Sequence, residues 1–303
     1  MRSRLLALPL VAGAAVLALA GCSTAAAPGG ATTDRTVDVV ASTNVYGSLV
    51  RTVGGDHVAV TSILEDPSQD PHSFESSATT QLAVSKADLL IENGGGYDDF
   101  MTSLRNASRT KAATIDVVRL SGLDTGGDAS FNEHVFYDYP TMVRLVSEIE
   151  RHLSTLDRAD ADVFAANAKS LTAKLQGLES QTAALKQQDG GEQVAYTEPV
   201  PGYLFDAIGL HNATPEAFSH AIEEGDDVPP LALHDTLALF TGGKVRLLAV
   251  NDQATSPQTE LVQKAAERAG VPVIGVTETL PAGKDYVSWQ QANIDAVRTA
   301  LAK

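Results

Sequence analysis

The chain has 303 residues and a formal net charge of −16, because 22 Lys and Arg residues face 38 Asp and Glu residues. So acidic a chain lacks the basic face that neutralises phosphates, which excludes a nucleic-acid binder. Hydrophobic residues at 44% and charged residues at 20% are globular proportions, suited to one large domain or two of ordinary size. The single cysteine, Cys22, excludes an internal disulfide and a Cys-based zinc cluster, so any metal site needs His, Asp, Glu or neutral oxygens.

The first residues have the pattern of a secretory signal. Arg2 and Arg4 precede an apolar run, Leu5 to Ala20, that ends in small residues before Cys22. The alternative, a transmembrane anchor, normally needs about 20 apolar residues, and this run is shorter. The tetrapeptide at 19–22 looks like a bacterial lipobox, which implies cleavage before Cys22 and a lipid on its sulfur. We therefore predict a signal peptide over 1–21 and a lipid anchor with a flexible tether over 22–35.

The next part of the chain alternates strand-like and helix-like segments. Short β-branched or apolar runs at 36–41, 57–64 and 87–92 predict strands, and the segments at 46–53 and 81–86 predict helices between them. This alternation is typical of a parallel sheet covered on both faces. The sequence predicts an N-terminal α/β lobe over 36–158.

A long helical region follows. Apolar residues recur at helical spacing over 141–153 and again over 159–186, where Gly177 is the only glycine and proline is absent. A helix of 28 residues is about 42 Å long, enough to bridge two lobes. Alternation then resumes, with strands predicted at 193–197, 245–250 and 273–276 and helices at 202–208, 229–241, 256–269 and 286–301. We predict a linking helix over 159–188 and a C-terminal α/β lobe over 189–303.

Candidate metal ligands lie in loops that follow strands or precede helices, where open α/β sheets bind ligands. They are His72, His134, Glu198 and Glu278. Two imidazoles and two carboxylates suit Mn²⁺, Fe²⁺ or Zn²⁺. The alternative is that these side chains cap helices or lie in solvent. Asp285 competes with Glu278 for the last position, although it precedes Tyr286, where it would cap the final helix.

Several motifs resemble the metal-binding receptors of zinc and manganese ABC importers, the cluster A-I solute-binding lipoproteins. The segments at 70–75 (DPHSFE) and 87–94 (ADLLIENG) resemble their first histidine loop and the strand after it. The segment at 133–140 (EHVFYDYP) is similar to their second histidine loop, and 197–199 (TEP) is similar to the third ligand loop. Glu278 falls where the family normally has an aspartate.

The resemblance implies a monomeric receptor with two α/β lobes joined by one long, rigid helix. His72 and His134 from the first lobe, with Glu198 and Glu278 from the second, would hold one divalent cation for delivery to a membrane permease. The lipid on Cys22 would anchor the protein to the cell membrane outside the cytoplasm. Catalytic motifs such as Gly-Xaa-Ser-Xaa-Gly are absent from the sequence, so we expect no enzyme. A secreted metal-dependent hydrolase and an adhesin that retains the fold stay as alternatives, and the choice among Mn²⁺, Zn²⁺ and Fe²⁺ stays open.

Overall fold

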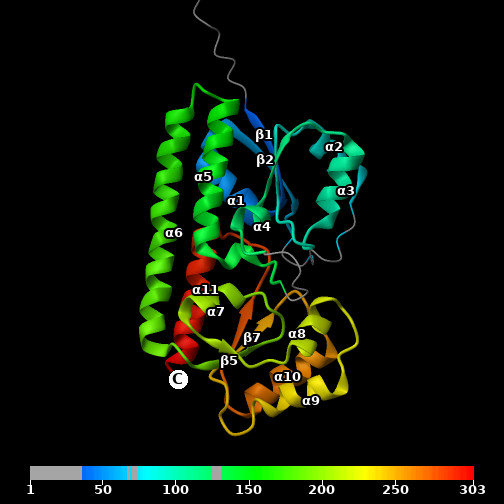
Figure 1. Cartoon of the computed structure of the whole chain (residues 1–303), viewed down its shortest axis with the longest axis vertical. Coiled ribbons are helices and arrows are strands. Elements are labelled where there is room, and N and C mark those ends of the chain that lie inside the picture. The colour runs from blue at the N-terminus through cyan, green and yellow to red at the C-terminus, as the bar shows by residue number, and fades with distance from the viewer. Residues whose placement is uncertain (1–35, 67–68, 70–73, 75, 125–130) are drawn as a thin grey trace, which may run out of the picture. The chain divides into compact units, whose positions relative to one another are not determined.

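The protein contains two α/β lobes, each built on a four-stranded parallel sheet (Figure 1). The computed structural model describes residues 36–66, 69, 74, 76–124 and 131–303. The predicted signal peptide, Cys22 and His72 lie outside these residues. Both lobes belong to one compact unit.

The sheet of the first lobe has the strand order β2-β1-β3-β4. Its strands are β1 (Val37–Thr43), β2 (Val58–Leu64), β3 (Leu89–Glu92) and β4 (Ala113–Asp116). Around it lie α1 (Asn44–Gly54), α2 (Ala78–Lys86), α3 (Asp99–Ser108), α4 (Val117–Ser121) and the short 3-10 turns η1 (Gly55–His57) and η2 (Val135–Tyr137). Every residue of β3 is buried, as expected for a central parallel strand with helices on both faces. The α/β lobe predicted from the alternation is confirmed.

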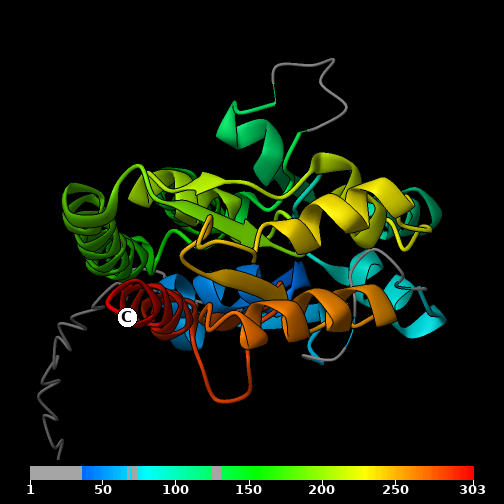
Figure 2. The same ribbon diagram turned by 90° about the horizontal axis from the view of Figure 1, so that it is seen from below.

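The sheet of the second lobe repeats this order as β6-β5-β7-β8. Its strands are β5 (Gln193–Tyr196), β6 (His211–Asn212), β7 (Leu248–Asn251) and β8 (Val273–Val276), and its helices are α7 (Gly202–Ile208), α8 (Glu216–Glu223), α9 (Pro230–Ala238), α10 (Pro257–Arg268) and α11 (Tyr286–Leu301). Figure 2 shows α8 and α9 in yellow on one side of the orange strand β7 and α10 on the other. From β5 the chain first adds β6 on one side and then β7 on the other, so the strand order changes direction between β5 and β7. Open α/β sheets bind ligands at such a point.

Helix α6 (Ala161–Asp189) joins the lobes, as predicted. It follows α5 (Tyr139–Leu156) and contacts α1 and α5 of the first lobe as well as α7 and α11 of the second. Its 29 residues make it about 43 Å long. The buried side chains alternate in steps of four and three residues, which keeps one apolar stripe against both lobes: Phe164, Ala168, Leu171, Leu175, Leu178, Thr182 and Leu185. One continuous apolar core therefore runs from β1 through α6 to α11.

Hydrogen bonds between the lobes surround the region that carries the candidate ligands. The Asn44 side chain accepts a bond from the Leu280 amide at 2.8 Å, and Tyr137 donates to the Thr277 carbonyl at 2.9 Å. On the other side, Asn132 donates to the Pro199 carbonyl at 3.0 Å. These bonds tie the two lobes to each other around the candidate ligands.

Several elements had no counterpart in the sequence prediction, namely α3, α4, α8, β4 and β6. Strand β6 has only two residues and α4 has five, too few for a periodic signal. Helix α8 does carry buried Phe218, Ala221 and Ile222 at helical spacing, a signal present in the sequence but overlooked. Among the described residues, no helix combines the length and apolar character needed to cross a membrane.

Candidate metal centre

The candidate ligands His134, Glu198 and Glu278 are brought together between the two lobes. Glu198 follows β5, Glu278 follows β8, and His134 lies just before η2 of the first lobe. Their exposed fractions are 0% for His134, 3% for Glu198 and 2% for Glu278. Such burial of three ionisable side chains is costly unless they are paired or hold an ion, so this is not a surface cluster.

The loop around Asn132 sets the orientation of the His134 ring. Asn132 uses its amide nitrogen to bond the Pro199 carbonyl, so its Oδ1 is the acceptor that faces His134. This oxygen accepts from the His134 backbone amide at 3.1 Å and lies 2.8 Å from the ring Nδ1. Nδ1 therefore carries a proton, and Nε2 is the nitrogen that would bind a metal. Tyr97 and Phe136 contact the ring edge-on and restrict its rotation.

Glu198 and Glu278 are linked through one amide group. The Asn251 Nδ2 donates to Glu198 Oε2 at 2.7 Å and to Glu278 Oε1 at 2.8 Å. Asn251 is the last residue of β7, one of the two strands between which the strand order changes direction. By donating to both carboxylates, it orients them and offsets part of their mutual repulsion. Asn251 was not predicted, although its place at a strand end was a usable signal.

The distance between Glu278 and His134 suits a shared cation. Glu278 Oε2 lies 3.6 Å from His134 Nε2. Two ligand atoms on one tetrahedral zinc lie roughly 3 to 3.5 Å apart, given metal–ligand distances of about 2.1 Å. In addition, Glu198 Oε1 is buried and has no hydrogen-bond partner among the described residues. These atoms can serve as donors to a single metal ion.

Burial and neighbouring charges shift the pKa values of the candidate ligands. Burial raises the pKa of Glu198 to about 8, although the bond from Asn251 lowers it. Burial by itself lowers the pKa of His134, but hydrogen bonding to Glu278 and the charges of neighbouring glutamates raise it to about 9. At neutral pH the metal-free cluster therefore holds protons that a metal ion would displace.

A further carboxylate, Glu223, approaches the cluster from the last residue of α8. Its Oε1 lies 3.8 Å from His134 Nδ1, and its side chain is 8% exposed. Burial raises the pKa of Glu223 to about 8, while the nearby His134 lowers it. Glu223 was not predicted as a site residue because α8 was not predicted.

Asp285, the competing candidate for the last ligand, is exposed and caps α11. Its side chain accepts a bond from the Ser288 amide at 2.8 Å. Hydrogen bonding to Ser288 lowers the pKa of Asp285. This is the capping role that its position before Tyr286 indicated.

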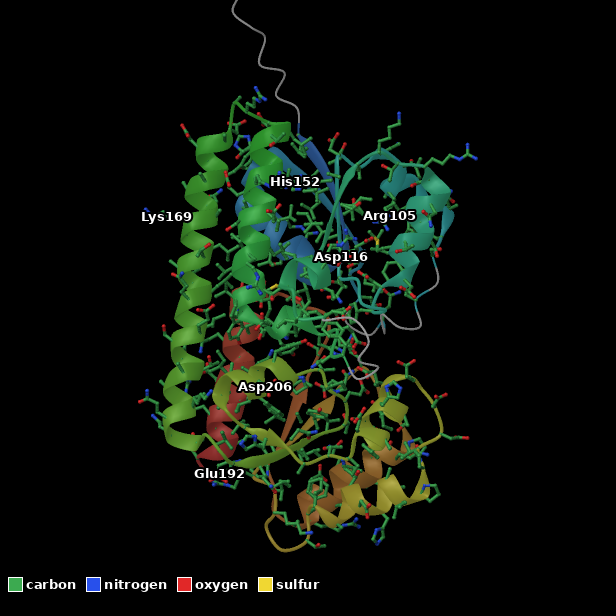
Figure 3. All side chains as sticks on the ribbon, viewed as in Figure 1. Arg105, Asp116, His152, Lys169, Glu192 and Asp206 are labelled. Atoms are coloured by element: carbon green, nitrogen blue, oxygen red, sulfur yellow. The ribbon has the colours of Figure 1, made fainter. Side chains whose placement is uncertain are left out.

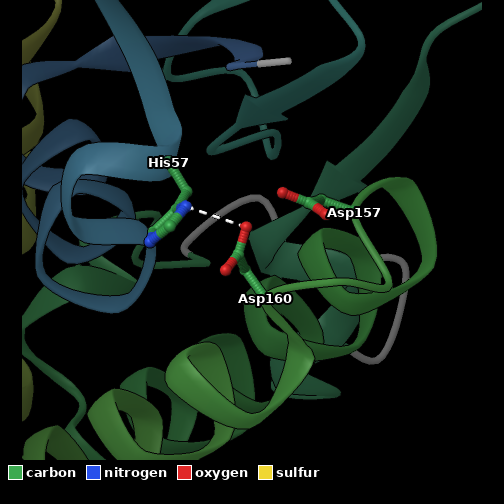
Figure 4. A group of neighbouring side chains, drawn as sticks. All are labelled: His57, Asp157 and Asp160. Atoms are coloured by element: carbon green, nitrogen blue, oxygen red, sulfur yellow. Dashed lines mark ion pairs between the residues drawn. The ribbon is translucent and has the colours of Figure 1, made fainter. Parts of the chain in front are cut away.

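A second group of possible ligands lies where η1 meets the turn between α5 and α6 (Figure 4). His57 Nδ1 pairs with Asp160 Oδ2 at 2.9 Å, and Asp157 Oδ1 accepts from the Ala159 amide at 3.1 Å. All three side chains are partly exposed. Their contacts fasten η1 to the α5–α6 turn, which accounts for this group without an ion.

Two α/β lobes, a long linking helix and a buried His–Glu cluster between the lobes define a solute-binding protein of the metal-transport class. Residues 39–300 match the model of the family described as zinc-uptake complex component A, periplasmic, and the chain belongs to this family.

Relatives of known name agree with this class. A manganese-binding lipoprotein of Bacillus subtilis, MntA, is 30% identical over 183 residues, which cover 59% of this chain and 58% of that protein. A metal ABC transporter substrate-binding lipoprotein of Lactococcus lactis is 22% identical over 97% of this chain and 96% of its own. The Streptococcus anginosus lipoprotein PsaA, named as a manganese ABC transporter substrate-binding protein, is 23% identical over 95% of this chain and 96% of its own.

Solved structures share the fold. The periplasmic zinc-binding protein TroA of Treponema pallidum superposes with a TM-score of 0.73 at 18% identity, covering 89% of this chain and all of that one. FpvC of Pseudomonas aeruginosa, solved with Mn²⁺, gives a TM-score of 0.71 at 20% identity, covering 88% of this chain and 99% of that one. The two-lobed architecture with a linking helix is therefore confirmed.

Proposed function

We propose that the protein is an extracytoplasmic receptor that binds one divalent transition-metal ion and delivers it to the permease of an ABC importer. The proposed ligands are His72, His134, Glu198 and Glu278. The relatives named as metal-binding lipoproteins of ABC importers support this reading. In this proposal the metal is the transported substrate. It is coordinated and released without any other chemical change.

One observation carries the proposal: a buried imidazole from one lobe faces two buried carboxylates from the other. Bringing Glu198 and Glu278 together as anions costs free energy that a divalent cation would offset. A cation held by both lobes stabilises the closed arrangement, which a permease can distinguish from the open one. The continuous helix α6 limits how far the lobes can separate.

The donors indicate the class of metal. Carboxylate oxygens favour Mn²⁺ or Fe²⁺, whereas Zn²⁺ stands above both in the Irving–Williams order and occupies most His/Glu sites in vitro. We propose Mn²⁺ or Zn²⁺, with Fe²⁺ as the further candidate of the same class.

Elemental analysis of protein stripped with a chelator and reloaded with metal tests the receptor against the alternatives. We expect one metal ion per chain, with no activity in a panel of hydrolase assays run on the same samples. Activity that depends on the metal would favour the secreted hydrolase. The adhesin would be favoured if the protein lost its metal and still supported adhesion.

Asn251 provides a prediction about a residue that orients ligands without binding the metal itself. Asn251→Ala removes the amide that bonds both Glu198 and Glu278. We expect metal affinity to fall by about 10- to 100-fold, the usual cost of losing such a partner. Competition with a chelating dye measures this, and Asn167→Ala, the same substitution on α6, is the control. Equal affinities for the two variants would contradict the orienting role.

The membrane anchor is proposed on Cys22. If it carries a lipid, Cys22→Ser should give a folded protein that leaves the membrane fraction for the soluble one, because a lipid chain supplies about 0.8 kcal/mol of membrane affinity per buried CH₂ group. Fractionation of cells with an antibody against the folded lobes measures this. Quantitative retention of the variant in membranes would refute the anchor.

A further inference from the structure

A cavity of about 620 Å³ is lined in part by Glu223, whose Oε1 lies 3.8 Å from Nδ1 of His134, whereas Glu278 lies on the Nε2 side of that ring. Residues of both lobes line it. Its acidic lining residues are Glu133, Asp206, Glu216, Glu223 and Glu224. Asp206 lies in α7 of the second lobe, and Figure 3 labels it. The negative charge of these walls raises the local concentration of cations.

Glu223 connects the surface of this cavity with its buried end. Its Oε2 lies 3.9 Å from Nδ1 of His220, whose side chain is 60% exposed, and its Oε1 lies 3.8 Å from Nδ1 of the fully buried His134. The side chain of Glu223 is itself 92% buried, since 8% is exposed. Oε1 has no hydrogen-bond partner among the described residues. A buried carboxylate oxygen with this surplus acceptor capacity points to a ligand outside the chain.

Glu133 completes a second group of donors. Ligand atoms of Glu133, His134 and Glu223 all lie within 4.8 Å of one another. Nδ1 of His134 is engaged by Asn132, so the two carboxylates are the donors for a cation here. They come from opposite lobes. Two carboxylates can hold a divalent cation that keeps several of its waters.

We propose that Glu223 and Glu133 form an outer cation-binding position, through which the metal passes between solvent and the inner ligands. This inference rests on the proposed receptor function and adds a route to it. The cation first exchanges part of its water for these carboxylates. It then moves past the imidazole of His134 to Nε2 and Glu278. Release follows the same route in reverse.

An intermediate position on the route of the ion should affect both directions of exchange. Glu223→Gln keeps the shape of the side chain and removes the carboxylate that would bind the cation. We expect the association and dissociation rate constants for Mn²⁺ each to fall about tenfold, with the equilibrium affinity within about threefold of the wild type. Stopped-flow fluorescence of Trp289, the only tryptophan, measures association, because Trp289 packs on Phe136 and Tyr137 beside His134. A chase with excess chelator measures dissociation.

Glu224→Gln is the matched control. Glu224 is the next residue, is exposed and lines the same cavity, so the substitution removes one carboxyl group from the same wall. We expect its rates to change less than about twofold at physiological salt, where exposed charges are screened. Glu133→Gln, on the other lobe, should reproduce the slow exchange of Glu223→Gln and serves if the latter fails to fold.

Three results would overturn the inference. Equal rates for Glu223→Gln and Glu224→Gln would mean that only the general field of the cavity acts. A loss of affinity above tenfold with unchanged association would make Glu223 an ordinary ligand of the inner site. Failure of the wild type to bind Mn²⁺ would refute the receptor function itself, and the outer position with it.

Discussion

Replacing His134 with Ala, or Glu278 with Gln, should weaken metal binding by more than about a hundredfold. Each change removes a donor that the proposed site contributes directly, and such a loss exceeds the 10- to 100-fold cost of losing an orienting partner. His134 Nε2 and Glu278 Oε2 lie 3.6 Å apart and are almost completely buried, so water reaches neither position easily to replace the lost donor. Titration with Mn²⁺ and Zn²⁺ in competition with a chelating dye measures the effect. The same loss is expected for His72→Ala.

Two substitutions of the same type serve as controls for this prediction. His234→Ala changes an imidazole whose side chain is 76% exposed, and Asp285→Asn changes the N-cap of α11. Neither should alter metal affinity, and Asp285→Asn should change stability by less than about 1 kcal/mol, because Asn and Asp cap helices about equally well. If Asp285→Asn abolished binding while Glu278→Gln had no effect, the last ligand would lie one loop further along the chain.

Metal affinity should rise steeply with pH between 6 and 8. The pKa of Glu198 is raised to about 8 and that of His134 to about 9, so in the metal-free protein both groups hold protons below these values. A metal ion binds only the deprotonated forms and must displace those protons. Each displaced proton makes the apparent affinity fall about tenfold for every unit by which pH drops below the pKa. With two protons displaced, and Glu198 already half deprotonated at pH 8, affinity at pH 6 should be about five-thousandfold below that at pH 8.

Proton release can be counted independently by calorimetry in buffers with different ionisation enthalpies. We expect about two protons per Mn²⁺ at pH 7 for the wild type. Glu198→Gln removes one of the displaced protons, so the slope of log affinity against pH should decrease by about one. An affinity that stays constant from pH 6 to 8 would show that the ligands are already deprotonated in the metal-free protein.

The donors that local sequence can identify are those fixed by a strand end or a loop. Glu198 and Glu278 directly follow predicted strands, and the structure has β5 and β8 ending two residues before each of them. His134 was found through its resemblance to a histidine loop. The alternation of strands and helices likewise predicted both parallel sheets, and an unbroken helical pattern predicted α6, because each of these signals is contained in neighbouring residues. His72 stays a prediction, since it lies outside the described residues.

The partners of these donors depend on contacts between segments distant in the chain, which no local periodicity encodes. The sequence places Asn251 at a strand end. Its amide reaches both Glu198 and Glu278 only because β7 pairs between β5 and β8. Similarly, Glu223 looks in the sequence like one more surface glutamate beside Glu224. It becomes part of the site because α8 packs its apolar face on the second lobe and the packing of the two lobes brings its carboxylate to His134. The sequence by itself thus determined the two lobes, the linking helix and the chemical nature of the candidate donors. Only tertiary packing decided which side chains orient those donors and which carboxylate lies on the proposed route to solvent.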